Sequence, residues 1–309
     1  MNTAADQPVS TPPSKLLTLA SDIKLSHSVF ALPFAVLGAY LAAANKGQLL
    51  HNDWVSLLLI LLCMFFARTV AMTINRLADH KIDILNPRTK GRAIPSGRLS
   101  FGYVMLVTIL CSVCFVLSAS GFWFFRENVW PVLLSPIVLI WLSAYSFMKR
   151  FTALCHIFLG SALAISPLAA GIAINPEYIK EPTLWLLAGM VLCWVAGFDV
   201  IYALQDEEPD IEHGIHSIPS TFGTRKSLWI SRILHLICLT CLYLFWKSTD
   251  HLGTVFSFGI GIVAILLIAE HILVRDPDTG KINMAFFTIN GCISVLLGVL
   301  GIVDVIRSV

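Results

Sequence analysis

Charged side chains are scarce in this sequence of 309 residues, since aspartate, glutamate, lysine and arginine together make up only 13% of it. Soluble domains carry roughly 25% of these residues. Hydrophobic residues account for 57% of the chain, and a fold in water has no way to hide so much apolar surface. The chain is therefore expected to use a lipid bilayer as its solvent.

The sequence also lacks an excess of positive charge, because its formal net charge is only +2. This balance argues against nucleic acid as a partner. No stretch alternates polar and apolar residues with a period of two, which argues against a membrane barrel. The pairs Cys111/Cys114 and Cys238/Cys241 have C-x-x-C spacing but lie in apolar runs, so we interpret them as small apolar residues rather than as zinc or redox sites.

Nine apolar segments meet or approach the roughly 20 residues that a helix needs to cross a membrane. They are 27–45, 54–75, 101–125, 128–148, 151–174, 183–204, 228–246, 252–273 and 282–306. The sequence thus predicts an all-α, polytopic bundle of about nine spans, built as one transmembrane domain over residues 21–309. Residues 1–20 begin with a polar, proline-containing stretch and are expected to form a disordered tail without the layout of a secretory signal.

Most of the 21 lysines and arginines fall on one side of this bundle if the N-terminus is placed in the cytoplasm. The bias satisfies the positive-inside rule and predicts a cytoplasmic N-terminus. The loss or merging of one weak segment, such as 228–246, would move the C-terminus to the same side.

Acidic motifs follow the second and the sixth predicted spans, over residues 75–83 and 199–210. The sixth span comes four spans after the second, which is an even number, so the two helices cross the membrane in the same direction. Both motifs therefore open on the same side of the membrane, whichever orientation the protein has.

Each motif places polar residues four apart, and residues four apart share one face of a helix. Asn75, Asp79 and Asp83 form one such stripe, while Asp206 and Asp210 form a second pair on a helix or around a turn. Mg²⁺ prefers hard oxygen ligands and usually takes one or two carboxylates plus phosphate oxygens. The spacing predicts that these five residues hold Mg²⁺ around a diphosphate; the alternative is a set of solvated interfacial carboxylates.

The loop after the first motif, residues 86–97, is punctuated by proline and glycine and carries three cations within five residues. Arginine can bind phosphate oxygens in a bidentate manner. We interpret six cations at this end as ligands of the diphosphate, although ordinary topology anchors are the alternative. They are Arg76, Lys81, Arg88, Arg92, Lys149 and Arg150.

These motifs resemble those of the UbiA-type prenyltransferase superfamily, and the resemblance covers nearly the whole chain. The second acidic motif is similar to D-x-x-Y-A-x-Q-D-x-x-x-D, and the loop is similar to R-T-x-x-R-P-x-P-S-G. Residues 145–152 resemble the pattern Y-P-x-x-K-R-x-T. One departure is Arg76, which stands where the family often has aspartate, so that it either replaces a metal ligand or meets the diphosphate directly.

The resemblance implies Mg²⁺-dependent transfer of a polyprenyl group from polyprenyl diphosphate to a small aromatic acid within the lipid bilayer. It further implies a bacterial inner membrane and an active site on the cytoplasmic face. The Asn75-Arg76 form is similar to the 4-hydroxybenzoate polyprenyltransferase-like branch, which serves ubiquinone or menaquinone biosynthesis. Some members of that branch resemble enzymes of the futalosine route, so a naphthoate precursor is the alternative acceptor.

Relatives that prenylate haem or chlorophyll share these motifs. From other classes, a membrane scaffold would not need duplicated acidic motifs. A transporter would be expected to carry its charges near the middle of the bilayer, often on broken helices in inverted repeats.

Two further charges lie inside the predicted spans. Arg68 lies seven residues before Asn75 and Asp199 lies seven before Asp206, which places each roughly 10 Å deeper on the same helical face. They are expected either to form a salt bridge or to flank the acceptor, with Arg68 on its carboxylate and Asp199 on its hydroxyl. Tyr202 lies one turn nearer the metals, and we interpret these three residues as catalytic.

Overall fold

The computed structural model describes residues 14–24 and 30–309, and within these ranges the chain forms helices and no strand. The helices are α1 (Lys15–Asp22), α2 (Leu32–Ala44), α3 (Trp54–Leu85), α4 (Phe101–Arg126), α5 (Trp130–Met148), α6 (Cys155–Ile174), α7 (Pro182–Ala203), α8 (Glu207–Glu212), α9 (Ile218–Phe222), α10 (Thr224–Lys247), α11 (Thr254–Leu273), α12 (Thr279–Asn283) and α13 (Asn290–Ser308). Eight segments of the described chain are long and apolar enough to cross a membrane, with α7 continuing into α8 and α12 into α13. The predicted all-α transmembrane bundle is therefore confirmed.

The predicted count of about nine spans is close to the eight long segments found in the described chain. The segment 27–45 corresponds to α2, which has only 13 residues and is shorter than a full crossing, while residues 27–29 lie outside the described ranges. Residues 15–20, expected to belong to a disordered tail, are helical in α1. Residues 1–13 of that expected tail lie outside the described part of the chain.

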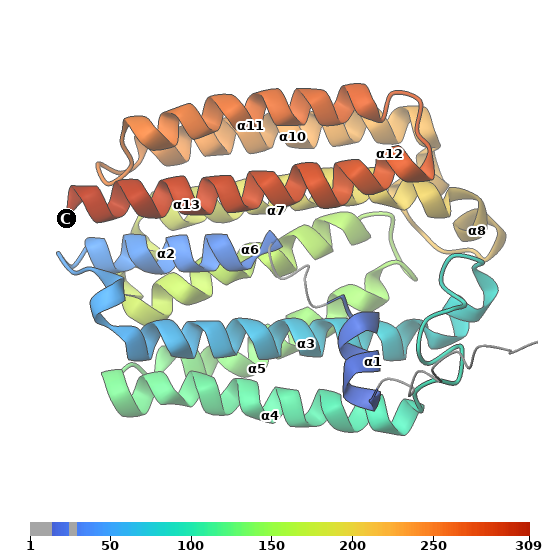
Figure 1. The fold of residues 1–309 in the computed structure, drawn as a ribbon, viewed down its shortest axis with the longest axis horizontal. Helices are drawn as coiled ribbons and strands as arrows, with labels where there is room; N and C mark the ends of the chain where they lie inside the picture. The colour runs from blue at the N-terminus through green and yellow to red at the C-terminus, as the bar shows by residue number, and fades with distance from the viewer. Residues whose placement is uncertain (1–13, 25–29) are drawn as a thin grey trace, which may run out of the picture.

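The long helices run side by side along one direction (Figure 1). α7 packs extensively along both α6 and α10, and it is the most buried of the spanning segments. Small residues allow the helices to approach closely. A Cβ added to Gly160 of α6 would stand 2.4 Å from the carbonyl oxygen of Leu192 in α7. Membrane helices associate through such contacts because lipid supplies no hydrophobic driving force between them.

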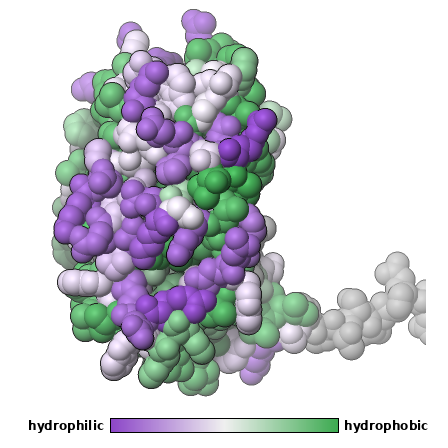
Figure 2. All heavy atoms as spheres, turned by 90° about the vertical axis from the view of Figure 1, so that its left-hand side faces the viewer, coloured by the Kyte–Doolittle hydropathy of each residue, from purple (hydrophilic) through white to green (hydrophobic). Residues whose placement is uncertain are grey.

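Large apolar side chains cover the outside of the bundle. Leu117, Ile140 and Phe258 are 63%, 67% and 71% exposed, respectively, although water would penalise that exposure. Figure 2 views the end of the bundle at which the C-terminus lies, and hydrophilic residues gather across this end with hydrophobic ones along its margins. Apolar sides capped by hydrophilic residues are the surface that a bilayer requires, so the chain is an integral membrane protein.

α3 is longer than the membrane is thick. Its 32 residues span about 48 Å, whereas the hydrocarbon core of a bilayer measures about 30 Å. The last turns of α3 therefore extend beyond the lipid. The loop 86–100 and α8 lie at this same end, opposite the C-terminus (Figure 1). We call this end, which carries both acidic motifs, the polar end of the bundle.

The C-terminal span contains a π-helical segment, Met284–Ile289, between α12 and α13. Such segments insert extra backbone into an α-helix and are frequent at functional sites. Here the segment brings the centre of the Phe286 ring to 4.2 Å from the centre of the Tyr202 ring on α7. Phe286 also contacts Phe198 edge to face at 5.1 Å. An aromatic wall therefore lines the interior just below the polar end.

Candidate active site

The first acidic motif lies on the last turns of α3, where the helical repeat turns its polar residues inward. Asp79 and Asp83 are 1% and 3% exposed. The amide of Asn75 donates to Oδ2 of Asp79 over 3.1 Å. The side chains predicted to form one stripe thus share one buried face of the helix.

Asp79 is held from a second direction by Lys149, whose Nζ lies 2.6 Å from Oδ2. Its other oxygen, Oδ1, is buried and has no hydrogen-bond partner among the described residues. A buried carboxylate oxygen without a partner is costly. This oxygen is therefore free to accept a ligand such as a hard cation.

Asp83 is bound by the loop that follows α3. Nη1 of Arg92 lies 2.8 Å and 2.9 Å from the two oxygens of Asp83. The hydroxyl of Thr89 donates to the backbone carbonyl of Asp83 over 3.1 Å. The cationic loop thereby folds back over the end of α3, so that its arginines lie beside the acidic motif.

The second motif does not continue as one helix. α7 ends at Ala203, a 3₁₀ turn follows over Leu204–Asp206, and Asp210 lies on the short helix α8. Asp206 and Asp210 therefore belong to the turn-borne arrangement that was one of the two alternatives.

Arg88 joins the second motif to the loop. Its guanidinium binds both oxygens of Asp206, with Nε 2.9 Å from Oδ1. The amide of Asn86 donates to the same Oδ1 over 2.9 Å, and Nη1 of Arg88 donates to the hydroxyl of Tyr202 over 3.2 Å. Burial alone would lower the pKa of Arg88, but the hydrogen bond with Asp206 and the charges of Asp206 and Asp83 together outweigh it, so the pKa is raised.

Arg76, expected to contact the diphosphate, is 5% exposed and is occupied by the chain itself. Its Nε lies 3.1 Å from Oδ2 of Asp22 on α1, and Nη1 donates to Oδ1 of Asn75 over 2.8 Å. The other oxygen of Asp22 accepts the backbone N–H of Ala93 over 2.7 Å. Arg76 and Asp22 therefore hold α1, α3 and the loop together.

Lys24 adds a further cation to this end. Its backbone adopts a positive φ of 47°, and its ammonium lies 4.9 Å from the centre of the Phe287 ring. Burial and the charges of Arg88, Arg76 and Arg92 lower the pKa of Lys24. A bound anion would relieve this repulsion, so the polar end is an electropositive, anion-accepting site.

Arg68 and Asp199 do not form an ion pair with each other, so the salt bridge that was one alternative is wrong. Nη2 of Arg68 donates to the carbonyl of Lys24 over 3.2 Å, while its buried Nε has no partner among the described residues. Asp199 instead binds His156 of α6, with Oδ2 2.7 Å from Nδ1. Oδ1 of Asp199 has no partner within the described ranges and remains available to a ligand.

Lys81 and Arg150 face away from the acidic stripe. Both line a groove of about 840 Å³ between α3, α4, α5 and the segment after α8. None of the three α3 motif residues lines it. Arg150 donates to the carbonyl of Ala78 and lies 5.2 Å from the centre of the Phe147 ring. The structure thus separates these two cations from the carboxylates beside which they were expected.

Several residues of the site were not anticipated from the sequence. Asp22, Asn86 and His156 each bind a predicted site residue. Asn86 is the first residue of the cationic loop, which was singled out from the sequence without a role for Asn86. His156 offered one usable signal, because a histidine in an apolar span is costly and usually faces the interior of the bundle.

The donor set fits a magnesium ion. No cluster of three or more His, Cys, Asp or Glu side chains within the described residues forms a closed metal site. Mg²⁺ does not require one, because it usually completes its shell with substrate phosphate oxygens and water. The unpartnered Oδ1 of Asp79 is the observation that favours a hard cation here.

Comparison with known proteins identifies the family. Residues 31–291 match the UbiA prenyltransferase family. The 4-hydroxybenzoate octaprenyltransferase of Tolumonas auensis is 31% identical over 239 residues, covering 76% of this chain and 79% of that protein. The protein of the same name from Hahella chejuensis is 30% identical over 260 residues, covering 83% and 81% of the two chains.

Solved structures share the fold. A UbiA homolog from Aeropyrum pernix K1, solved in its apo form, aligns with a TM-score of 0.78 at 26% identity and covers 91% of this chain and 98% of that one. A UbiA homolog from Archaeoglobus fulgidus, solved bound to DMAPP and Mg²⁺, aligns with a TM-score of 0.68 at 21% identity and covers 94% and 99%. The protein therefore belongs to the UbiA prenyltransferase family and is a membrane-embedded enzyme of the prenyltransferase class.

Proposed function

We propose that the protein transfers a polyprenyl group from polyprenyl diphosphate to a small aromatic acid of the 4-hydroxybenzoate type, with Mg²⁺, in ubiquinone or menaquinone biosynthesis. The observation that carries this proposal is the alternation of buried carboxylates and cations at the polar end of an apolar bundle. A metal-bound diphosphate needs both kinds of group. The names of the relatives support the acceptor, and the Archaeoglobus structures solved with prenyl diphosphates and Mg²⁺ support the donor.

The residues that would hold Mg²⁺ are Asn75, Asp79, Asp83, Asp206 and Asp210. A Mg²⁺ ion held there would supply positive charge to the leaving diphosphate. Oδ1 of Asp79, which has no partner among the described residues, supports this assignment. We assign the site to the cytoplasmic face of a bacterial inner membrane, because most cations of the chain lie at this end.

Arg88, Arg92 and Lys149 each bind a carboxylate in the chain without substrate. When the diphosphate is present, the same N–H donors bind its oxygens and stabilise the leaving group. Arg76 instead positions α1 and Asn75. Lys81 and Arg150 line the separate groove, so they contribute positive potential rather than direct contacts.

The acceptor lies deeper, between α3 and α7. The buried Nε of Arg68 has no partner among the described residues, which supports a role in binding the acceptor carboxylate. Oδ1 of Asp199 accepts a hydrogen bond from the hydroxyl of the aromatic acceptor, and His156 holds the Asp199 carboxylate in place through Oδ2. Tyr202 and Phe286 wall the reacting carbon from water. The allylic C–O bond breaks, a bond to the aromatic ring forms, and the ring releases one proton.

The test uses membranes that contain the protein, a radiolabelled polyprenyl diphosphate and a panel of aromatic acids, including 4-hydroxybenzoate and a naphthoate. A labelled product is expected with 4-hydroxybenzoate and only when Mg²⁺ is present. Asp79→Asn and Asp206→Asn should each remove most of the activity while the protein still inserts. Asp276→Asn, which alters an exposed carboxylate beyond α11, serves as the matched control. Near-normal turnover in both site variants would refute the assignment, and a product with the naphthoate alone would change the acceptor.

A further inference from the structure

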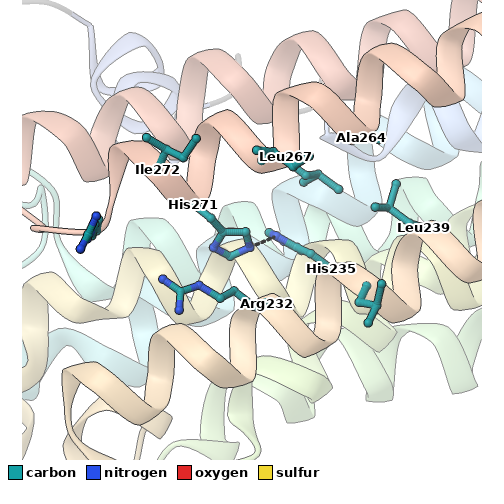
Figure 3. A pocket seen from close by; sticks show the side chains of 10 residues that line it. Arg232, His235, Leu239, Ala264, Leu267, His271 and Ile272 are labelled. Atoms are coloured by element: carbon teal, nitrogen blue, oxygen red, sulfur yellow. Dashed lines mark hydrogen bonds between the residues drawn. The ribbon is translucent and has the colours of Figure 1, made fainter.

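A groove of about 560 Å³ opens between α10 and α11, away from the acidic motifs, and we call it the α10–α11 groove. Ten side chains line it, and Figure 3 labels seven of them. The lining residues are Arg232, His235, Leu236, Leu239, Ala264, Leu267, Ile268, His271, Ile272 and Arg275. Its walls are aliphatic except for two arginines and two histidines.

A hydrogen bond between the two histidines sets the relative height of the helices. Nδ1 of His235 and Nε2 of His271 are 3.0 Å apart (Figure 3). α10 and α11 are antiparallel neighbours, so α10 begins at the polar end, where α11 ends. Arg232 precedes His235 by three residues of α10 and so lies about 5 Å nearer the polar end, while Arg275 lies just beyond the end of α11 at Leu273. Both arginines therefore lie on the polar-end side of the histidines, at the mouth of the groove.

The floor of the groove is rigidly held. Nε2 of His235 contacts the carbonyl of Trp194 over 3.3 Å, and the indole of Trp194 donates to Asn290 over 2.7 Å. Asn290 in turn donates to Glu270 over 2.8 Å. Glu270 is fully buried behind the histidines, so its carboxylate does not line the groove.

In the part of the chain that the structure describes, the two arginines have no ionic or hydrogen-bonded partner. Within the described residues no carboxylate lies within 4 Å of either guanidinium, and neither guanidinium donates a hydrogen bond to the chain. Arg232 lies 4.7 Å from the centre of the exposed Trp229 ring. Tryptophan is enriched at the level of lipid headgroups. The mouth of the groove is thus at the height where lipid phosphates lie.

We propose that the α10–α11 groove binds one molecule of an anionic glycerophospholipid. Its phosphate lies between Arg232 and Arg275, and one acyl chain follows the aliphatic walls toward Leu239 and Ala264. Charge complementarity selects this occupant, because two unpaired cations face the phosphate and no acidic side chain lines the groove. A zwitterionic lipid brings its own cation to the same place and so loses that advantage. Basic pockets between membrane helices bind anionic headgroups in this way.

The experiment is a lipid titration of the detergent-solubilised protein followed by native mass spectrometry, with phosphatidylglycerol and phosphatidylcholine as probes. Each interfacial cation contributes roughly fivefold to binding an anionic lipid, so the double variant Arg232→Gln/Arg275→Gln should bind phosphatidylglycerol about 30-fold more weakly. The single variant Arg275→Gln lies outside the spans and should lose about fivefold. The matched control Arg225→Gln/Lys226→Gln removes two exposed cations from the same end and should bind like the original protein.

The proposal fails if phosphatidylcholine binds as tightly as phosphatidylglycerol, or if the control double variant loses as much affinity as the groove variant. Should the groove double variant not fold, the single variant Arg275→Gln decides. Unchanged phosphatidylglycerol affinity in that variant overturns the proposal. Prenyl transfer is not part of the readout, so the result is independent of the proposed reaction.

Discussion

His156 gives the most discriminating test of the acceptor site. Its Nδ1 lies 2.7 Å from Oδ2 of Asp199, while its Nε2 accepts the backbone N–H of Ile218 over 3.2 Å. Because Nε2 accepts a hydrogen bond, the proton of the neutral ring must be on Nδ1. The two nitrogens thus have different partners, and each can be imitated by a different amide. Asparagine places its NH₂ group near Nδ1, whereas glutamine reaches the position of Nε2.

The size of the effect follows from burial. His156 is 3% exposed and the Asp199 side chain 20% exposed, so water screens their hydrogen bond little. A hydrogen bond to a charged group contributes about 1.5–3 kcal/mol. If the loss of this hydrogen bond raises the activation free energy by about 2 kcal/mol, kcat falls about 30-fold, since each 1.36 kcal/mol is a factor of ten. We therefore expect His156→Gln to lose about that much, and His156→Asn to stay within about threefold because it keeps the donor to Asp199.

The assay measures kcat and KM for prenyl donor and aromatic acceptor separately, in membranes adjusted to equal amounts of folded protein. The loss in His156→Gln should fall on kcat and on the acceptor, with the KM for the prenyl donor unchanged. A purely structural role would instead make both variants lose folded protein and leave the turnover of the remainder normal. Equal kcat in His156→Gln and His156→Asn would refute the reasoning.

Other changes separate the remaining parts of the structure. Arg88→Gln should raise the KM for the prenyl diphosphate about tenfold or more, whereas Arg150→Gln should change it little because Arg150 lines the separate groove; equal effects would contradict that separation. At the opposite end, the hydrogen bond from Arg126 holds the pKa of Asp53 at about 2, below its usual 3.8. The stabilisation is therefore full above about pH 4 and is lost as pH falls through 2, and thermal melts between pH 6 and 2 should show a smaller acid-induced drop in Asp53→Asn. Gly160→Val should lower the melting temperature by forcing α6 away from α7, and an unchanged melting temperature would mean that this contact is not tight.

The apolar runs of the sequence predicted the fold well, because a bilayer leaves helices as the ordinary way to satisfy backbone groups. Within the described residues every predicted segment contains a helix, and the even step from the second to the sixth span correctly brought both acidic motifs to one end. The first span was overestimated because the apolar run continues across residues that α2 does not include.

The pairing of charges was much harder to predict. Equal spacing of seven residues indicated that Arg68 and Asp199 share a depth, but spacing on two helices says nothing of how they are rotated against each other. A third helix, α6, supplies His156, which lies 43 positions before its partner. Asp206 and Asp210 illustrate the same limit, since the helix ends at Ala203 and the repeat no longer holds beyond it. The sequence indicated the cationic loop. Which carboxylate each of its arginines binds depends on the path of the loop in space, which the sequence pattern does not give.

The length of α3 has a consequence for kinetics. Its acidic turns lie beyond the hydrocarbon, while the aromatic wall of Phe198 and Phe286 lies within the bundle. On the proposed function, the prenyl donor stays dissolved in the membrane, and the aromatic acid arrives from water. The concentration that matters for the donor is then its mole fraction among lipids. Diluting a vesicle suspension should leave the donor's saturation curve unchanged, whereas adding empty lipid to the same vesicles should lower the rate as surface dilution requires.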